Sequence, residues 1–196
     1  MDVVELGGIR LHLLRVHPGL PHEADRVTRE LQRLAPAVVL GDLTTEDALR
    51  LRGALAEKKP FEPGFVDALY YDATRERFAG DATTVEHPLA AAARFARDRR
   101  SEFIPLLPIT KKPGFLARRR MRKAVERAQA ATHEAFPAAF VKALAGAWEP
   151  RDDVEPAHRR TLRALQEGRA PVVAVVQAHR ADAFLQLVHA TGRIPA

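Results

Sequence analysis

Two apolar, strand-like runs near opposite ends of the chain each lead into a histidine, and a helical pattern follows each run. The first run, 9–16, leads into His17, and the second, 171–178, leads into His179. Ligands of open α/β sheets bind in the crevice outside the carboxyl ends of the strands. If these runs form neighbouring parallel strands, the two ends of the chain share one site. The sequence leaves that pairing open.

Strand and helix patterns alternate between these two runs. The continuous apolar run 37–40 is typical of a strand buried on both faces, and Pro105 favours an edge position for the strand expected at 103–107. We therefore predict an α/β fold with a mostly parallel central sheet flanked by helices. All 196 residues are expected to form one domain, whose mostly helical middle section, 58–153, covers one end of the sheet. In the middle section and beyond it, helices are expected over 65–78, 88–97, 115–132, 133–148, 155–167 and 181–190.

Several classes of function are excluded or left unsupported by what the sequence lacks. The chain contains no cysteine, which excludes disulfides, Cys-ligated zinc and thiol nucleophiles. Glycine-rich phosphate-binding motifs, a Gly-x-Ser-x-Gly motif and an HExxH motif are absent as well. The first residues do not resemble a secretion signal, and no stretch approaches the roughly 18 apolar residues of a membrane span. We expect a cytoplasmic protein with no membrane span.

The net charge of +6 is unevenly distributed. Residues 94–127 carry twelve basic and three acidic side chains, a net charge of +9, so the rest of the chain sums to −3. The basic residues are Arg94, Arg97, Arg99, Arg100, Lys111, Lys112, Arg118, Arg119, Arg120, Arg122, Lys123 and Arg127. A solvated helix face is the ordinary interpretation of such a segment. A surface for nucleic acid or another polyanion is the alternative.

Five residues are candidates for a site. Asp42 follows the run 37–40, so its carboxylate and the imidazoles of His17 and His179 are expected at one crevice. Two histidines and a carboxylate form a catalytic metal set, here for Mn²⁺, Co²⁺ or Zn²⁺, and imidazoles also serve as general acids or bases. Alternatively, each histidine satisfies a local backbone group. Glu86 is either a helix cap or a further site group. Arg159 is either surface charge or a bidentate partner of an anionic substrate.

Both ends of the chain resemble the TraB/Tiki/GumN family, within a broader group that includes ChaN-like and erythromycin-esterase-like folds. Leu14-Arg15-Val16-His17 stands where the family has a GxxH motif, and 36–43 where it has a strand written roughly P-x-V-V-x-x-E-L. Glu86 with its Ala-rich helix looks like the family's mid-chain helix start. The run 172–179 resembles the second GxxH strand, and the preceding helix usually bears an arginine, which Arg159 or its neighbour His158 would match.

The resemblance implies metal-assisted hydrolysis of an amide or ester bond in a small peptide or small molecule, with a metal-activated water as the nucleophile. The chain departs from the family pattern, because Leu14 and Val176 replace the glycines of the two motifs and Asp42 replaces the glutamate. The alternative is a degenerate, non-catalytic module that binds a peptide, a partner or a polyanion through the basic 94–127 segment. A third alternative is a homodimer formed through the apolar helices of the middle section.

Overall fold

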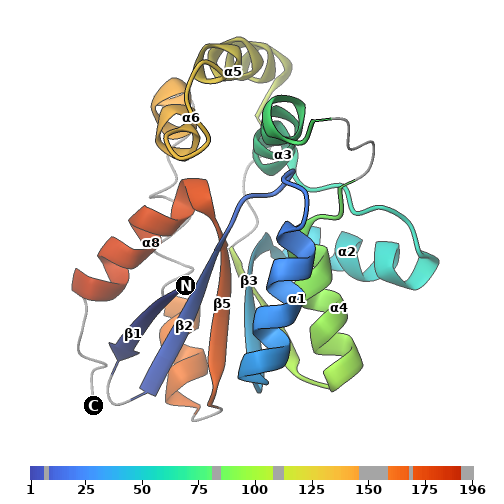
Figure 1. Ribbon diagram of the computed structural model, residues 1–196, viewed down its shortest axis with the longest axis vertical. Helices are drawn as coiled ribbons and strands as arrows, with labels where there is room; N and C mark the ends of the chain where they lie inside the picture. The colour runs from blue at the N-terminus through green and yellow to red at the C-terminus, as the bar shows by residue number, and fades with distance from the viewer. Residues whose placement is uncertain (7–8, 81–84, 108–112, 146–158, 168–169, 191–196) are drawn as a thin grey trace.

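Five strands form one mostly parallel sheet in the computed structural model of the chain (Figure 1). The structure describes residues 1–6, 9–80, 85–107, 113–145, 159–167 and 170–190. The strands are β1 (Asp2–Leu6), β2 (Ile9–Val16), β3 (Val38–Thr44), β4 (Glu102–Leu107) and β5 (Val172–Gln177). Their order is β1-β2-β5-β3-β4, with β1 antiparallel to β2 and the other pairs parallel. The predicted α/β class and the edge position of β4 are confirmed.

The two histidine-terminated runs lie side by side. β2 and β5 pair in parallel over their length, with Leu11 opposite Val172 and Val16 opposite Gln177. β5 also pairs with β3, so the last strand of the chain occupies the middle of the sheet. Every residue of β3 and β5 is buried, which explains their continuous apolar runs. The pairing on which a shared site depends is therefore present.

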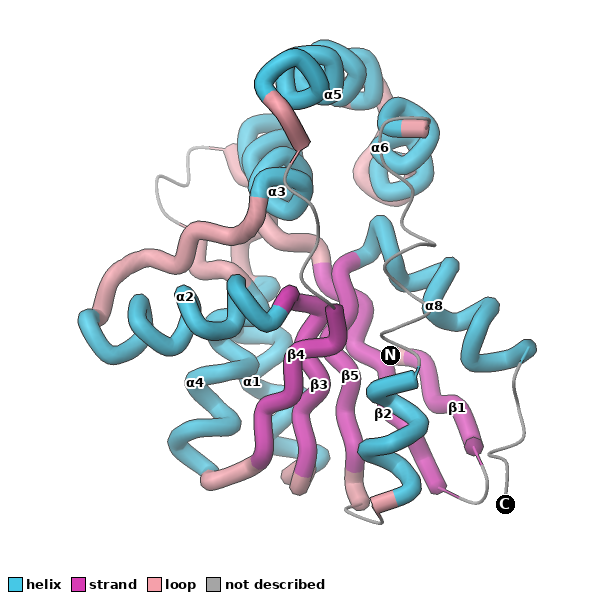
Figure 2. The backbone as a smooth tube through the Cα atoms, turned by 180° about the vertical axis from the view of Figure 1, so that it is seen from behind, coloured by secondary structure: helices cyan, strands magenta, loops and turns pink. Residues whose placement is uncertain are grey.

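Helices cover both faces of the sheet (Figures 1 and 2). They are α1 (Glu23–Leu34), α2 (Thr45–Glu57), α3 (Phe65–Phe78), α4 (Pro88–Arg99), α5 (Phe115–Ala128), α6 (Phe136–Leu144), α8 (Ala178–Ala190) and a helix over 159–166. α1 and α4 pack on one face, where they contact the side of β5 that carries Val173 and Val175. The 159–166 helix and α8 pack on the opposite face, which carries Val172, Ala174 and Val176. Alternate residues of one strand thus enter two different cores.

The middle section of the chain divides between two parts of the fold. α3, α5 and α6 stand over the carboxyl ends of the parallel strands (Figure 1), whereas α4 and β4 belong to the sheet and its covering layer. Tyr70, Phe136 and Phe140 build a separate apolar cluster among these three helices, and the cluster reaches Ala178 at the start of α8. The helical cover expected over one end of the sheet is thus made by three helices. Residues 81–84, 108–112 and 146–153 of the section lie outside the described part.

Among the element bounds that differ from those expected, three are informative, and two of these change the site. β3 continues two residues beyond Asp42, so this carboxylate lies within the strand instead of following it. α8 begins directly after β5, so His179 lies in the first turn of a helix. α6 begins at Phe136 with Pro137 in its first turn, where the missing N–H of proline costs no hydrogen bond. Pro137 is therefore compatible with the start of this helix, which begins three residues later than expected.

Gly41 lies in β3 where the ring of Phe103 crosses from β4. A Cβ on Gly41 would collide with the Cζ of Phe103 and lie 3.0 Å from its Cε2. We expect Gly41→Ala to lower the free energy of unfolding by about 1–3 kcal/mol, because the ring must leave its position. Denaturant titration measures this loss. Gly53→Ala in α2 is the control, because no atom lies within 4 Å of its added Cβ and the helix gains stability. Equal effects of the two substitutions would contradict the prediction.

Candidate functional site

The carboxyl ends of β2, β3 and β5 meet beneath α3. Val16 and Gln177 are paired across β2 and β5, so the segments that begin with His17 and Ala178 leave neighbouring strands at the same level. Gly41 of β3 is paired with Val175 of β5, which brings Asp42 to that level too. Parallel pairing thus gathers polar side chains from three strand ends at one edge of the sheet, as the sequence predicts for His17, Asp42 and His179.

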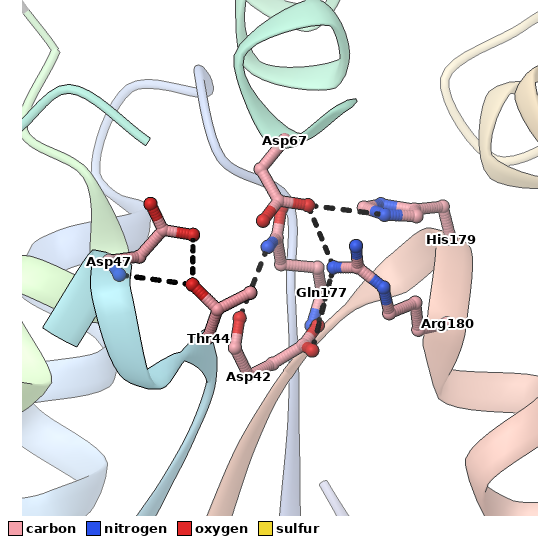
Figure 3. A network of polar contacts seen from close by, with 7 residues as sticks. All are labelled: Asp42, Thr44, Asp47, Asp67, Gln177, His179 and Arg180. Carbon is pink, nitrogen blue, oxygen red and sulfur yellow. Dashed lines mark hydrogen bonds and ion pairs between the residues drawn. The ribbon is translucent and has the colours of Figure 1, made fainter. Parts of the chain in front are cut away.

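One guanidinium joins three elements at this edge (Figure 3). Nη1 of Arg180 in α8 donates to Oδ1 of Asp67 in α3 at 2.7 Å and lies 3.3 Å from Oδ2 of Asp42 in β3. That Oδ2 also accepts the backbone N–H of Gln177 at 3.0 Å. Nε2 of His179 lies 3.7 Å from Oδ1 of Asp67. All four ionisable side chains are at most 5% exposed, so this is a buried charge network.

Asp67 has the most unusual carboxyl group of the network. Burial raises the pKa of Asp67 to about 7. The Arg180 cation lowers this pKa, whereas the negative charges of Asp42 and Asp47 raise it further. One guanidinium thus faces two carboxylates, and the carboxyl that remains uncompensated retains its proton more readily. Asp67 is consequently a carboxyl group that changes protonation near neutral pH.

Tyr70 of α3 lies between the two predicted histidines. Its ring centroid is 4.4 Å from that of His179, and its hydroxyl oxygen is 3.4 Å from Nδ1 of His17. Burial, together with the nearby His133, lowers the pKa of His17 to about 4. Burial and the charge of Arg180 hold the pKa of His179 well below its usual value. Both imidazoles are therefore neutral at pH 7, and they flank one buried tyrosine.

The predicted metal set does not fit this arrangement. Both carboxylate oxygens of Asp42 lie within 3.5 Å of Nη1 of Arg180, and the residue is 2% exposed. Within the described ranges, no three His, Asp or Glu side chains are grouped so that they could hold a metal ion. A metal ligand role for Asp42 would require the carboxylate to exchange a guanidinium and a backbone N–H for the ion. We therefore derive no chemistry through a metal at His17, Asp42 and His179.

Glu86 is not part of the network. Its carboxylate makes a two-point ion pair with Arg94 of α4, and its side chain is 38% exposed. The N-cap of α4 is His87, whose Nδ1 accepts the backbone N–H of Leu89 at 3.2 Å. The cap role expected for Glu86 thus belongs to its buried neighbour, because a side chain at the N-cap position reaches the free N–H groups of the first turn.

The arginine that reaches a strand end from the 159–166 helix is Arg160. Its Nη1 donates to the backbone oxygens of Pro105 at 2.6 Å and Leu107 at 3.0 Å, at the carboxyl end of β4. Arg159 is exposed, and His158 lies outside the described residues. Arg160 satisfies carbonyl groups of the edge strand and so has a structural role at this position.

Asp67, Tyr70 and Arg180 were missed by sequence reasoning. The apolar residues of α3 predict an inner face formed by Phe65, Leu69, Ala73 and Phe78. The buried residues are instead Asp67, Tyr70, Ala73 and Thr74. Phe65, Leu69 and Phe78 are half-buried against α5 and α6. A signal was present, because Asp67, Tyr70 and Thr74 are spaced three and four residues apart and so share one helix face. Arg180 directly follows His179, but its role depends on the early start of α8.

The basic segment 94–127 does not form one surface. Arg97 and Arg99 lie in the last turn of α4, near the amino ends of the strands, whereas the basic residues of α5 lie on the helices over the carboxyl ends (Figure 1). Lys111 and Lys112 fall outside the described residues. The two described parts of this segment thus lie at opposite ends of the sheet, and a polyanion site on the segment stays a prediction.

The fold and the network together define an α/β protein with a buried charge cluster at the carboxyl edge of its sheet. No family model matches this chain, and comparisons with curated proteins and with solved structures gave no significant match. The resemblance to the TraB/Tiki/GumN family, the homodimer and the cytoplasmic location thus stay predictions. None of the helices in the described part of the chain is long and apolar enough to span a membrane.

Proposed function

We propose that this chain is a hydrolase that cleaves an amide or ester bond of a peptide or small molecule at the carboxyl edge of β2 and β5. The observation that carries the proposal is the parallel β2–β5 pair, which brings His17 and His179 to the two sides of Tyr70. Crevices at this edge are the usual binding sites of α/β sheets. Strongly shifted pKa values also cluster at functional sites, and His17, Asp67 and His179 at this edge have them.

Hydrolysis of such a bond needs a proton acceptor for the attacking water and a proton donor for the leaving group. His17 is half-buried, and its pKa of about 4 leaves it neutral and able to accept a proton at pH 5–7. Asp67, with a pKa of about 7, still carries a proton in that range. The hydroxyl of water adds to the carbonyl carbon while His17 takes the proton. The bond to nitrogen or oxygen then breaks, and the leaving group receives the proton of Asp67 through the adjacent His179.

Arg180 and Asp42 are positioning residues in this scheme. The guanidinium holds the carboxyl of Asp67 beside His179, and Asp42 fixes the guanidinium through contacts that also involve the backbone of Gln177. Because these groups are buried, the hydrogen bonds between them are stronger than they would be in water. The scheme requires no metal ion.

The test is a hydrolysis assay with p-nitrophenyl esters and short peptide amides as a substrate panel. We expect kcat/KM to rise as the pH passes about 4 and to fall as it passes about 7, because His17 must be neutral and Asp67 protonated. Asp67→Asn and His17→Ala should each lower kcat/KM about 100-fold. Asp72→Asn, at an exposed position of the same helix, is the control and should leave kcat/KM unchanged. Turnover of no substrate, or full activity in folded Asp67→Asn, would refute the proposal.

The divalent metal implied by the family resemblance is tested separately. Titration calorimetry of the protein with Mn²⁺, Co²⁺ and Zn²⁺ measures binding, and the His17→Ala/His179→Ala variant reports whether these imidazoles are ligands. Heat that the double variant abolishes would support the metal prediction. Absence of heat with the wild-type protein would remove the metal and leave the acid–base scheme in place.

A further inference from the structure

α5 has one face that packs on the protein and one that faces solvent. Met121, Val125 and Ala128 are buried against α3 and α6. The residues that we call the exposed face of α5 are Phe115, Leu116, Arg119, Arg120, Arg122, Lys123, Glu126 and Arg127. The helix of 14 residues is about 21 Å long and lies at the outer end of the molecule (Figure 1). Its exposed face is thus an extended surface at one end of the protein.

The exposed face of α5 is strongly cationic. It has five basic side chains and a single acidic one, Glu126. In the parts of the chain that are described, Arg119, Arg120 and Lys123 make no ion pair with a carboxylate, whereas Arg97 near the other end of the sheet pairs with Asp98. Arg122 lies over the ring of Phe65, 5.8 Å from its centroid. Charge complementarity therefore points to an anionic partner for this face.

Two large apolar side chains share that face. Phe115 is 78% exposed and Leu116 is 68% exposed, more than the other exposed large hydrophobic residues, Met1, Val3 and Leu49. A polyanion such as nucleic acid is bound by cations and by aromatic stacking, and an exposed leucine contributes little to either. Apolar side chains beside a row of cations are instead what an anionic membrane surface binds, because the apolar groups enter the headgroup and acyl boundary.

We propose that the exposed face of α5 docks this protein on an anionic lipid surface. Phe115 and Leu116 enter the interface, and Arg119, Arg120 and Lys123 contact the phosphates of the headgroups. The buried face of α5 stays packed on the protein, so docking requires no unfolding of the helix. The contact leaves the edge of the sheet that holds His17 and Arg180 unchanged, and the inference stands independently of the hydrolase proposal.

Vesicle sedimentation with the full-length protein tests this proposal. Vesicles of 70% phosphatidylcholine and 30% phosphatidylglycerol are compared with vesicles of phosphatidylcholine alone, at about 0.1 M salt, where surface charges are only partly screened. We expect binding to the anionic vesicles only. Arg119→Glu/Lys123→Glu should weaken it by about tenfold or more. Phe115→Ala/Leu116→Ala, which leaves the charge unchanged, should weaken it by about tenfold.

Arg97→Glu/Arg99→Glu at the end of α4 is the matched control, and it should bind as the wild-type protein does. Equal binding of Phe115→Ala/Leu116→Ala and wild type would overturn the proposal, since charge alone would then account for the affinity. Binding to a DNA duplex without binding to anionic vesicles would also overturn it, and would identify the partner as a polynucleotide. Circular dichroism verifies that each variant is folded.

Discussion

Arg180→Met is expected to lower the free energy of unfolding by about 3–5 kcal/mol at pH 7. The methionine fills a similar volume but leaves Asp42 and Asp67 buried without the cation that faces both of them. An uncompensated buried charge is far more costly than a missing contact. Guanidinium chloride titration of the variant and the wild-type protein measures the loss.

The deficit of Arg180→Met should shrink as the pH falls. Without the guanidinium, the folded-state pKa of Asp67 rises further, and a carboxyl with a raised folded-state pKa loses its stabilising proton as the pH rises. Because Asp67 of the wild-type protein is itself protonated below about pH 7, the variant should recover part of its stability as the pH falls from about 9 to 7. Asp67→Asn in the same chain should also recover part of it by removing one of the two carboxylates. Arg163→Met, at a side chain that is 83% exposed, is the control and should change stability by less than about 0.5 kcal/mol. A loss below about 1 kcal/mol for Arg180→Met would contradict the prediction.

His87→Asn is expected to reduce the acid sensitivity of the fold. Burial lowers the pKa of His87 from 6.5 to about 3. Above pH 6.5 the imidazole is neutral in both states, and between pH 6.5 and about 3 the unfolded chain binds a proton that the folded chain does not. The contribution of His87 to stability is therefore lost as the pH falls, by up to about 1.4 kcal/mol for each pH unit. Asparagine is a good N-cap residue and does not titrate, so it preserves the start of α4.

The measurement is the free energy of unfolding at pH 7.5 and at pH 4.5. The wild-type protein should lose about 3 kcal/mol more than His87→Asn between these values. His17 and His179 act in the same direction as His87, whereas the raised pKa of Asp67 acts in the opposite direction, and these contributions cancel in the comparison. His189→Asn, at an exposed position of α8, is the control and should follow the wild-type pH dependence. The same pH dependence in wild type and His87→Asn would disprove the prediction.

Local periodicity accounts for the parts of the fold that the sequence predicted well. The helix expected at 65–78 is α3 with the same bounds, and the strand expected at 103–107 is β4 with one residue added. Pro105 correctly indicated an edge strand, because proline has no N–H for a second neighbour. The end of β3 and the start of α8 were less well predicted. β3 passes directly into α2, and β5 passes directly into α8, with no glycine or proline at either junction to mark the boundary.

The candidate site was predictable only in part. His17 and His179 could be placed at one edge because strand ends are visible in the sequence and parallel strands share an edge. Asp67 and Tyr70 could not, because they reach the edge from a helix that follows β3 by some twenty residues and whose inner face was assigned to other side chains. Glu86 was expected near the site but pairs with Arg94 on the surface.

The sequence by itself determined the alternation of strands and helices, the absence of cysteine chemistry and the two histidines at strand ends, since each of these depends on composition or on neighbours along the chain. Only the tertiary structure decided the state of the charged groups. Asp42, Asp67 and Arg180 come from three separate elements, and their pairing and burial exist only when those elements are packed together. Desolvation and charge pairing set a pKa, and both depend on distances in space that no local pattern contains.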